Sequence, residues 1–236
     1  LPQKLLVDGS RIIVNDFTGN KLVIFDPTQS TEELNFISIP SPVENSVTAD
    51  FAIDGDKNIW YTNWIFRQDG VLIKFDHDSY SKTLATSSNN TLPINDYLKV
   101  VRLPDELNTP NGAVADAEGN IWLADTSASS VFEFDPDTEV FTNYMTSDPH
   151  PLSFGNASGV IKAPISRPYW IDITDDQKLV FNEQTANRIG VLDPERDALV
   201  EYMVPSMNPN WADCGDSEED CGLAQVFDLA ISGDKI

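Results

Sequence analysis

The sequence predicts an all-β protein, a β-propeller of four-stranded antiparallel blades, and three observations support this fold class. The segment Ser166–Pro205 contains four short apolar runs separated by turn residues, which is typical of a four-stranded antiparallel sheet. Looser copies of this segment recur along the chain, as in repeat architectures. Amphipathic patterns of helix length are absent. A β-sandwich and a β-solenoid are the alternative folds.

The most regular part of the repeat is a short motif that follows a turn and ends in Asp, Asn or Glu. Its copies are Ile13–Asp16, Trp60–Asn63, Trp122–Asp125 and Val180–Glu183, which lie 47, 62 and 58 residues apart. These spacings mostly exceed the roughly 40–50 residues of common propeller blades, so we expect inserted loops. A further Asp follows ten residues after three of the copies, at Asp26, Asp135 and Asp193.

Taken in order, the repeats divide the chain into blades. The expected ranges are about 1–40 (third strand Lys21–Phe25, fourth strand Leu34–Ile39), 47–104, 109–146 and 166–205, with a linker over 148–166. Leu84–Tyr97 is polar and turn-rich, which predicts a surface loop. A fifth repeat begins at Leu223 and stops at Ile236. Since an open propeller leaves unpaired strand edges, we expect one propeller domain over 1–236 that belongs to a six- or seven-bladed ring; a complete small propeller is the alternative.

The net charge of −23 restricts the classes of partner. It argues against nucleic acid, which needs a basic surface, and against anionic membranes. It favours solubility, cation binding or a basic partner. No apolar run approaches the ~20 residues that span a bilayer, so no transmembrane segment is expected.

Two features predict a location outside the cytoplasm, extracellular or at the cell surface. Cys214 and Cys221 are the only cysteines, and their proximity favours a local disulfide; two free thiols are the alternative. Glycosylation sequons begin at Asn89 and Asn156. The acidic loop 213–220 is interpreted as a solvated segment, with calcium binding as the alternative.

Two stretches resemble the streptogramin lyase (virginiamycin B lyase) family of seven-bladed propellers. They are Pro110–Gly112 with Gly119–Trp122, and Glu183–Asp193. The resemblance implies the propeller fold and, in the family, elimination at a lactone ring with bound magnesium and a catalytic histidine in a Pro-His-Gly element. The matching positions here hold Ala49, Asn111, Tyr169 and Val226, whereas the two histidines, His77 and His150, lie elsewhere in the repeat. No catalytic residue is therefore assigned. Pro110–Gly112 with Ala124–Thr126 also resembles the metal-binding Asn segment of gluconolactonase/regucalcin-like propellers.

If the repeats superpose, the strand ends converge near one mouth of the propeller. This groups oxygen-bearing side chains that suit calcium or magnesium, namely Asp16, Asn63, Asn111, Asp125 and Glu183. The alternative is that these residues cap strand ends and bond to turn backbone. Trp64, Tyr169 and Trp170 are candidates for a ligand-binding surface near this mouth, whereas Trp60 and Trp122 are expected in the core between blades.

Two functional hypotheses follow. The first is an extracytoplasmic binding or assembly module without lyase activity, with other protein chains as partners. The second is a Mg- or Ca-dependent lyase or lactonase acting on a cyclic ester, with catalytic residues in sequence beyond Ile236.

Overall fold

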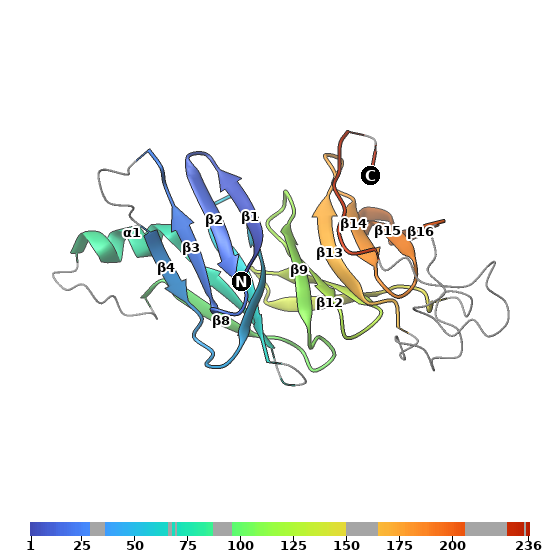
Figure 1. Ribbon diagram of the computed structural model, residues 1–236, viewed down its shortest axis with the longest axis horizontal. Coiled ribbons are helices and arrows are strands. Elements are labelled where there is room, and N and C mark those ends of the chain that lie inside the picture. The colour runs from blue at the N-terminus through green and yellow to red at the C-terminus, as the bar shows by residue number, and fades with distance from the viewer. Residues whose placement is uncertain are drawn as a thin grey trace. The chain divides into compact units, whose positions relative to one another are not determined.

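The protein is described by a computed structural model, in which residues 1–28, 36–65, 68, 70–86, 96–149, 165–205, 226–233 and 235–236 are described. Four antiparallel sheets of four strands fill it, and we call them blades 1 to 4 (Figure 1). Two blades lie in each of two compact units, Leu1–Pro110 and Asn111–Ile236, which are treated separately below. Cys214, Cys221, His150, both sequons, the acidic loop and most of the linker lie outside the described residues.

In every blade the strands pair in chain order, as predicted for the repeat. Blade 1 contains β1 (Pro2–Asp8), β2 (Arg11–Asp16), β3 (Lys21–Phe25) and β4 (Phe36–Pro40). Blade 2 contains β5 (Val47–Ile53), β6 (Ile59–Trp64), β7 (Gly70–Phe75) and β8 (Leu98–Arg102). Blade 3 contains β9 (Pro110–Ala115), β10 (Ile121–Asp125), β11 (Ser130–Asp135) and β12 (Val140–Met145). Blade 4 contains β13 (Pro168–Ile173), β14 (Leu179–Glu183), β15 (Arg188–Asp193) and β16 (Ala198–Met203), with a 3-10 turn, η2 (Pro194–Arg196), before β16.

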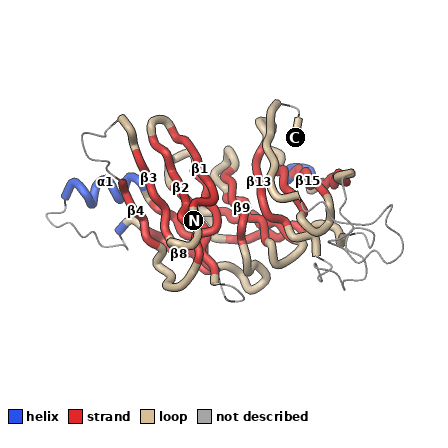
Figure 2. Tube along the Cα trace, in the orientation of Figure 1, coloured by secondary structure: helices blue, strands red, loops and turns tan. Residues whose placement is uncertain are grey.

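One helix that the sequence did not indicate, α1 (His77–Thr86), lies between β7 and β8 (Figure 2). The predicted surface loop Leu84–Tyr97 therefore begins as the end of this helix. The carboxylate of Asp76 accepts the backbone N–H of Ser79 at 2.7 Å and caps the helix. Tyr80 packs on Phe75, with ring centroids 5.2 Å apart. A ten-residue, mostly polar helix with so few apolar contacts leaves a weak periodic signal in the sequence.

The same hydrogen bond holds Trp60 and Trp122 in place. It lies in the hairpin formed by the first two strands of blade 2 and of blade 3. Trp60 Nε1 donates to Asp54 at 2.8 Å, and Trp122 Nε1 donates to Asp116 at 2.9 Å. Both indoles are only 1% exposed, which confirms their predicted place in the core. The carboxylate thus satisfies the one polar atom of each buried indole.

A second recurring contact joins each blade to the next strand along the chain. In unit 1, Asn15 Nδ2 donates to the backbone oxygens of Thr48 and Ala49, at 3.0 and 2.8 Å. Thr62 Oγ1 donates in the same way to the backbone oxygen of Pro110 at 2.9 Å. Asn15 and Thr62 hold the next-to-last position of the repeat motif, so this position links neighbouring strands rather than binding a ligand.

In unit 2 the same contact fixes the register of the segment after blade 4. Asn182 Nδ2 donates to the backbone oxygen of Val226 at 2.5 Å, as Asn15 Nδ2 donates to that of Thr48 at 3.0 Å. Thr48 pairs with Asn63 as Pro168 pairs with Glu183, so Thr48 and Pro168 are equivalent. Val226 is therefore equivalent to Pro168. The residue equivalent to Tyr169 is Phe227, which corrects the sequence alignment by one residue and still provides no histidine.

The start of blade 3 packs very closely on the start of blade 4. A Cβ added to Gly112 would lie 2.4 Å from the backbone oxygen of Tyr169, so only glycine fits there without movement of the backbone. The Pro-Asn-Gly element at 110–112 thus serves close packing. No helix in the part of the chain that the structure describes has the length and apolar character needed to cross a membrane.

Candidate functional site

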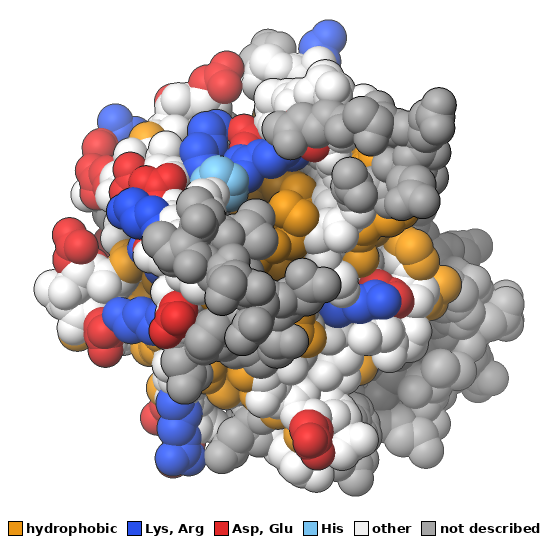
Figure 3. Space-filling model, turned by 90° about the vertical axis from the view of Figure 1, so that its left-hand side faces the viewer, with side chains coloured by type: hydrophobic (Ala, Val, Ile, Leu, Met, Phe, Trp, Pro, Cys, Tyr) orange, Lys and Arg blue, Asp and Glu red, His pale blue; other side chains and the backbone are white. Residues whose placement is uncertain are grey.

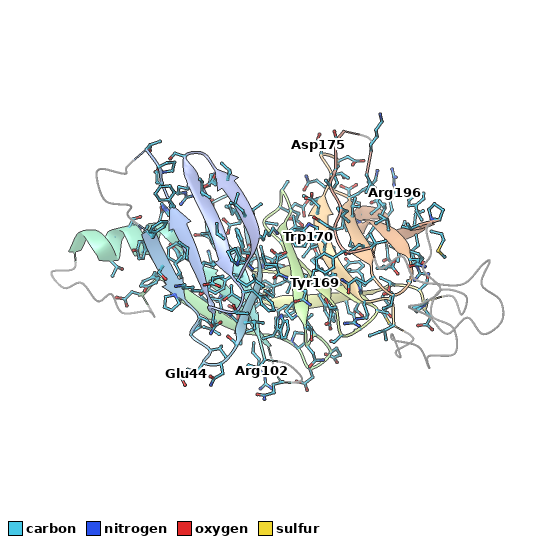
Figure 4. The ribbon with its side chains drawn as sticks, viewed as in Figure 1. Glu44, Arg102, Tyr169, Trp170, Asp175 and Arg196 are labelled. Carbon is cyan, nitrogen blue, oxygen red and sulfur yellow. The ribbon has the colours of Figure 1, made fainter. Side chains whose placement is uncertain are left out.

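Aromatic side chains gather in unit 2 at the start of β13. Figure 4 shows Tyr169 and Trp170 on this strand, and both are partly exposed. The ring of Phe227 stacks on Tyr169 with centroids 4.9 Å apart and planes inclined by 34°. Phe227 itself is 58% exposed. We call Tyr169, Trp170 and Phe227 the aromatic surface.

Trp64, the third predicted ligand-binding residue, lies in unit 1. It is half-buried, and its ring meets Phe17 edge-on with centroids 6.0 Å apart. Its Nε1 is buried and has no hydrogen-bond partner among the described residues. The ligand-binding role of Trp64 stays a prediction.

The predicted metal ligands of unit 1 are both tied to nearby groups. Asp16 Oδ1 accepts a hydrogen bond from the backbone N–H of Gly19 at 3.1 Å. Asn63 Nδ2 donates to three oxygens, including Oδ1 of Asn20 at 3.0 Å. Asn63 Oδ1 is buried without a partner in the described residues. Both side chains thus form hydrogen bonds at strand ends, and their role as metal ligands stays a prediction.

Asn111 and Asp125 make similar local contacts in unit 2. Asn111 Nδ2 donates to Thr126 Oγ1 at 2.8 Å, and the Thr126 hydroxyl in turn donates to the backbone oxygen of Pro168. Asp125 Oδ1 accepts the backbone N–H and the hydroxyl of Ser127, at 2.9 and 2.7 Å. Asp125 is fully buried. These contacts fix the turn after β10.

Glu183 forms a buried ion pair. Its Oε2 accepts both Nε and Nη2 of Arg188, at 3.1 and 2.7 Å, and its side chain is 0% exposed. Arg188 also reaches Glu201 at 3.4 Å and donates to the backbone oxygen of Ser147 at 2.5 Å. Glu183 Oε1, in contrast, has no hydrogen-bond partner in the described part of the chain. The Arg188 guanidinium therefore pairs with two carboxylates, those of Glu183 and Glu201.

The pKa of Glu183 is raised to about 7. Burial is the largest cause, and the carboxylate of Glu201 adds to it, while Arg188 acts in the opposite direction. An acid with this pKa changes its charge near neutral pH. It has the electrostatic character of a functional carboxylate, although buried structural ion pairs produce the same effect.

Among the described residues there is no group of three or more His, Cys, Asp and Glu side chains that could hold a metal ion. His77 lies at the start of α1 with its side chain 38% exposed, as expected for a surface residue. Charged side chains of both signs are spread over the face that carries this helix (Figure 3).

The residues that link the blades were not singled out in the sequence, although a signal was present. Asn15, Thr62 and Asn182 are polar residues at one repeat position of otherwise apolar, buried strands. Since buried polar groups need partners, this repetition predicts a shared hydrogen bond.

Comparisons with known proteins agree on the fold. No family model and no curated protein matches the chain. Among solved structures it is similar to a streptogramin B lyase (18% identity, TM-score 0.62, 89% of this chain and 56% of that chain). It is also similar to virginiamycin B lyase from Staphylococcus aureus, with 14% identity and a TM-score of 0.60 over 87% of this chain and 56% of that chain. A chain of a nidogen/laminin complex has 12% identity and a TM-score of 0.58, over 86% of this chain and 63% of that chain. The chain is a streptogramin lyase-like β-propeller in fold. This propeller chain spans just over half the length of those lyases, and the likeness concerns the fold alone.

Proposed function

We propose that this propeller is a binding or assembly module that holds other protein chains through its aromatic surface. The observation that carries the proposal is the stack of Tyr169 on the 58% exposed Phe227. Partly exposed aromatic side chains supply large contact areas at little entropic cost and are enriched at protein interfaces. The polar residues at equivalent strand ends are instead engaged in contacts within the fold.

One structural neighbour supports a protein partner. The similar chain of the nidogen/laminin complex is found with another protein. We further infer that the chain works outside the cytoplasm, as the sequons and the Cys214–Cys221 pair suggest. Alkylation of both cysteines without prior reduction would contradict that location.

Photo-crosslinking tests the binding role. A benzophenone amino acid placed at Phe227 in the full-length protein should crosslink to a distinct partner chain in its native medium. The same probe at Glu44, an exposed residue of unit 1, is the control and should not do so. Loss of the crosslink in a Tyr169→Ala background would support the aromatic surface, whereas equal crosslinking from both positions would refute it.

A metal-dependent lyase or lactonase is the second candidate function, and the unpartnered, buried Oε1 of Glu183 favours it. The surroundings do not fit a divalent cation, because the Arg188 guanidinium already occupies the other oxygen of this carboxylate. We therefore derive no reaction step through a metal.

Calorimetric titration separates the two candidates. Mg²⁺ and Ca²⁺ titrated into the chelator-treated full-length protein should give no saturable heat. Removal of metal should likewise leave the thermal unfolding temperature unchanged. Tight binding that disappears in both Asp125→Asn and Glu183→Gln would instead establish a cation site and favour the lyase or lactonase.

A further inference from the structure

Blades 3 and 4 enclose a groove within unit 2 that none of the predicted site residues lines. It consists of two cavities, of about 580 and 430 Å³, which share the side chain of Tyr144. The Tyr144 ring packs on Trp122 with centroids 5.2 Å apart, and its hydroxyl donates to Glu133 at 3.1 Å. Tyr144 is thus held from two sides and separates the groove into two halves.

The larger half has an apolar side and a polar side. Val131, Phe181, Leu192 and Leu199 form the apolar side, with Met145 at the surface and 73% exposed. The polar side is formed by Thr142, Asn143, Thr146 and Asp197. A cavity of this size between two packed sheets takes one or two aliphatic or aromatic side chains.

The smaller half is acidic. Its carboxylates are Asp116, Glu118, Glu133, Asp176, Asp193 and Glu195. Its two cations are already paired, Lys178 with Asp176 at 2.5 Å and Arg196 with Asp193 at 3.3 Å. Figure 4 labels Arg196 in the turn before β16. Among the residues that the structure describes, four carboxylates of this half are therefore left without a cation of their own.

The raised pKa of Glu133 reflects the excess of negative charge in this half. Burial raises the pKa of its carboxyl, and the nearby carboxylates of Asp116, Asp135 and Glu118 raise it further. The equivalent residue of blade 2 is Lys74, which pairs with Trp60 in the sheet as Glu133 pairs with Trp122. The Lys74 ammonium lies 5.5 Å from the Trp60 ring. The acidic character at this repeat position thus belongs to blade 3 and not to blade 2.

We propose that this groove binds a short extended segment of a protein partner, with an apolar side chain against the apolar side of the larger half and Arg or Lys in the acidic half. Charge complementarity selects the occupant, because a guanidinium or ammonium would neutralise carboxylates that lack a cation. The groove goes beyond the proposed function, since it shares no residue with the aromatic surface.

Fluorescence anisotropy with defined peptide pools tests this assignment. The first pool contains decapeptides with Leu, Met or Phe in one half and Arg or Lys in the other, in both orders. A second pool replaces the basic residues with Asp or Glu, and a third replaces the apolar residues with Ser. The first pool should bind the full chain about tenfold more tightly than either of the others. Equal affinity for the three pools would overturn the proposal.

Charge reversal locates the site. Glu133→Lys copies the residue of blade 2 and should weaken binding of the first pool about tenfold. Glu44→Lys makes the same change in net charge in an exposed loop of unit 1 and should leave affinity within about twofold, since its charge is screened. Glu195→Lys, on the exposed rim, repeats the test should Glu133→Lys fail to fold. Equal weakening by the groove and control variants would refute the groove. Tyr169→Ala should have no effect, which separates this site from the aromatic surface.

Discussion

Replacement of Arg188 by Ala should lower the free energy of unfolding by about 3–5 kcal/mol at pH 8. The guanidinium is the only cation that contacts Glu183 in the described structure, and it also contacts Glu201. Without it, a fully buried carboxylate and its neighbour would face each other unpaired. The variant would also lose the hydrogen bond to the backbone oxygen of Ser147. Urea unfolding followed by tryptophan fluorescence measures the change.

Arg196→Ala is the matched control, because Arg196 pairs with Asp193 but is 77% exposed. Exposed ion pairs contribute little to stability, so this variant should unfold almost as the wild type does. The loss in Arg188→Ala should shrink at pH 5, where Glu183 is protonated. Equal stability of the two variants at pH 8 would show that the buried pair does not hold blade 4 together.

The blade architecture was accessible from the sequence because its signals are local and repeated. Turn residues bound the strands of blade 4, and Trp60 and Trp122 recur at one position, so strand type and order followed from pattern alone. The helix α1 was missed because few apolar residues mark it. The shift from Val226 to Phe227 was missed because this segment contains no tryptophan or proline to anchor the repeat.

The hydrogen-bond partners of the candidate site residues were less accessible from the sequence, for a physical reason. The repeat placed Asp16, Asn63, Asp125 and Glu183 at equivalent strand ends, which suggested a common site. Asp125 and Glu183 form hydrogen bonds with residues close to them in sequence, whereas Asn63 bonds to Asn20, 43 positions away. Sequence spacing gives the position of a side chain and not its partner. The groove of unit 2 was inaccessible for the same reason, since Tyr144 and Glu133 become neighbours only through strand pairing and packing between blades.

Glu183→Gln should remove a pH dependence of stability. Because burial raises the pKa of Glu183 from 4.5 to about 7, the folded protein binds a proton more tightly here than the unfolded chain does. The stabilising effect is complete below pH 4.5 and is lost as the pH rises through 7. One pKa unit corresponds to about 1.4 kcal/mol. The free energy of unfolding of the Glu183→Gln variant should therefore exceed that of the wild type by about 3 kcal/mol at pH 8 and nearly equal it at pH 4.

The difference in stability between the wild type and the Glu183→Gln variant reports on Glu183 alone. The other carboxylates are the same in both proteins, and several of them have a lowered pKa instead of a raised one. Asp8, for example, has its pKa lowered by hydrogen bonds from Lys57 and Arg11, so its contribution is lost as the pH falls. Urea unfolding of both proteins at pH 4, 6 and 8 gives the required comparison. If Gln is instead less stable at pH 8, the attraction of Arg188 exceeds the cost of burial, and the pKa of Glu183 lies below 4.5. Glu183 would then be a permanently charged partner of Arg188 rather than a group that titrates near neutral pH.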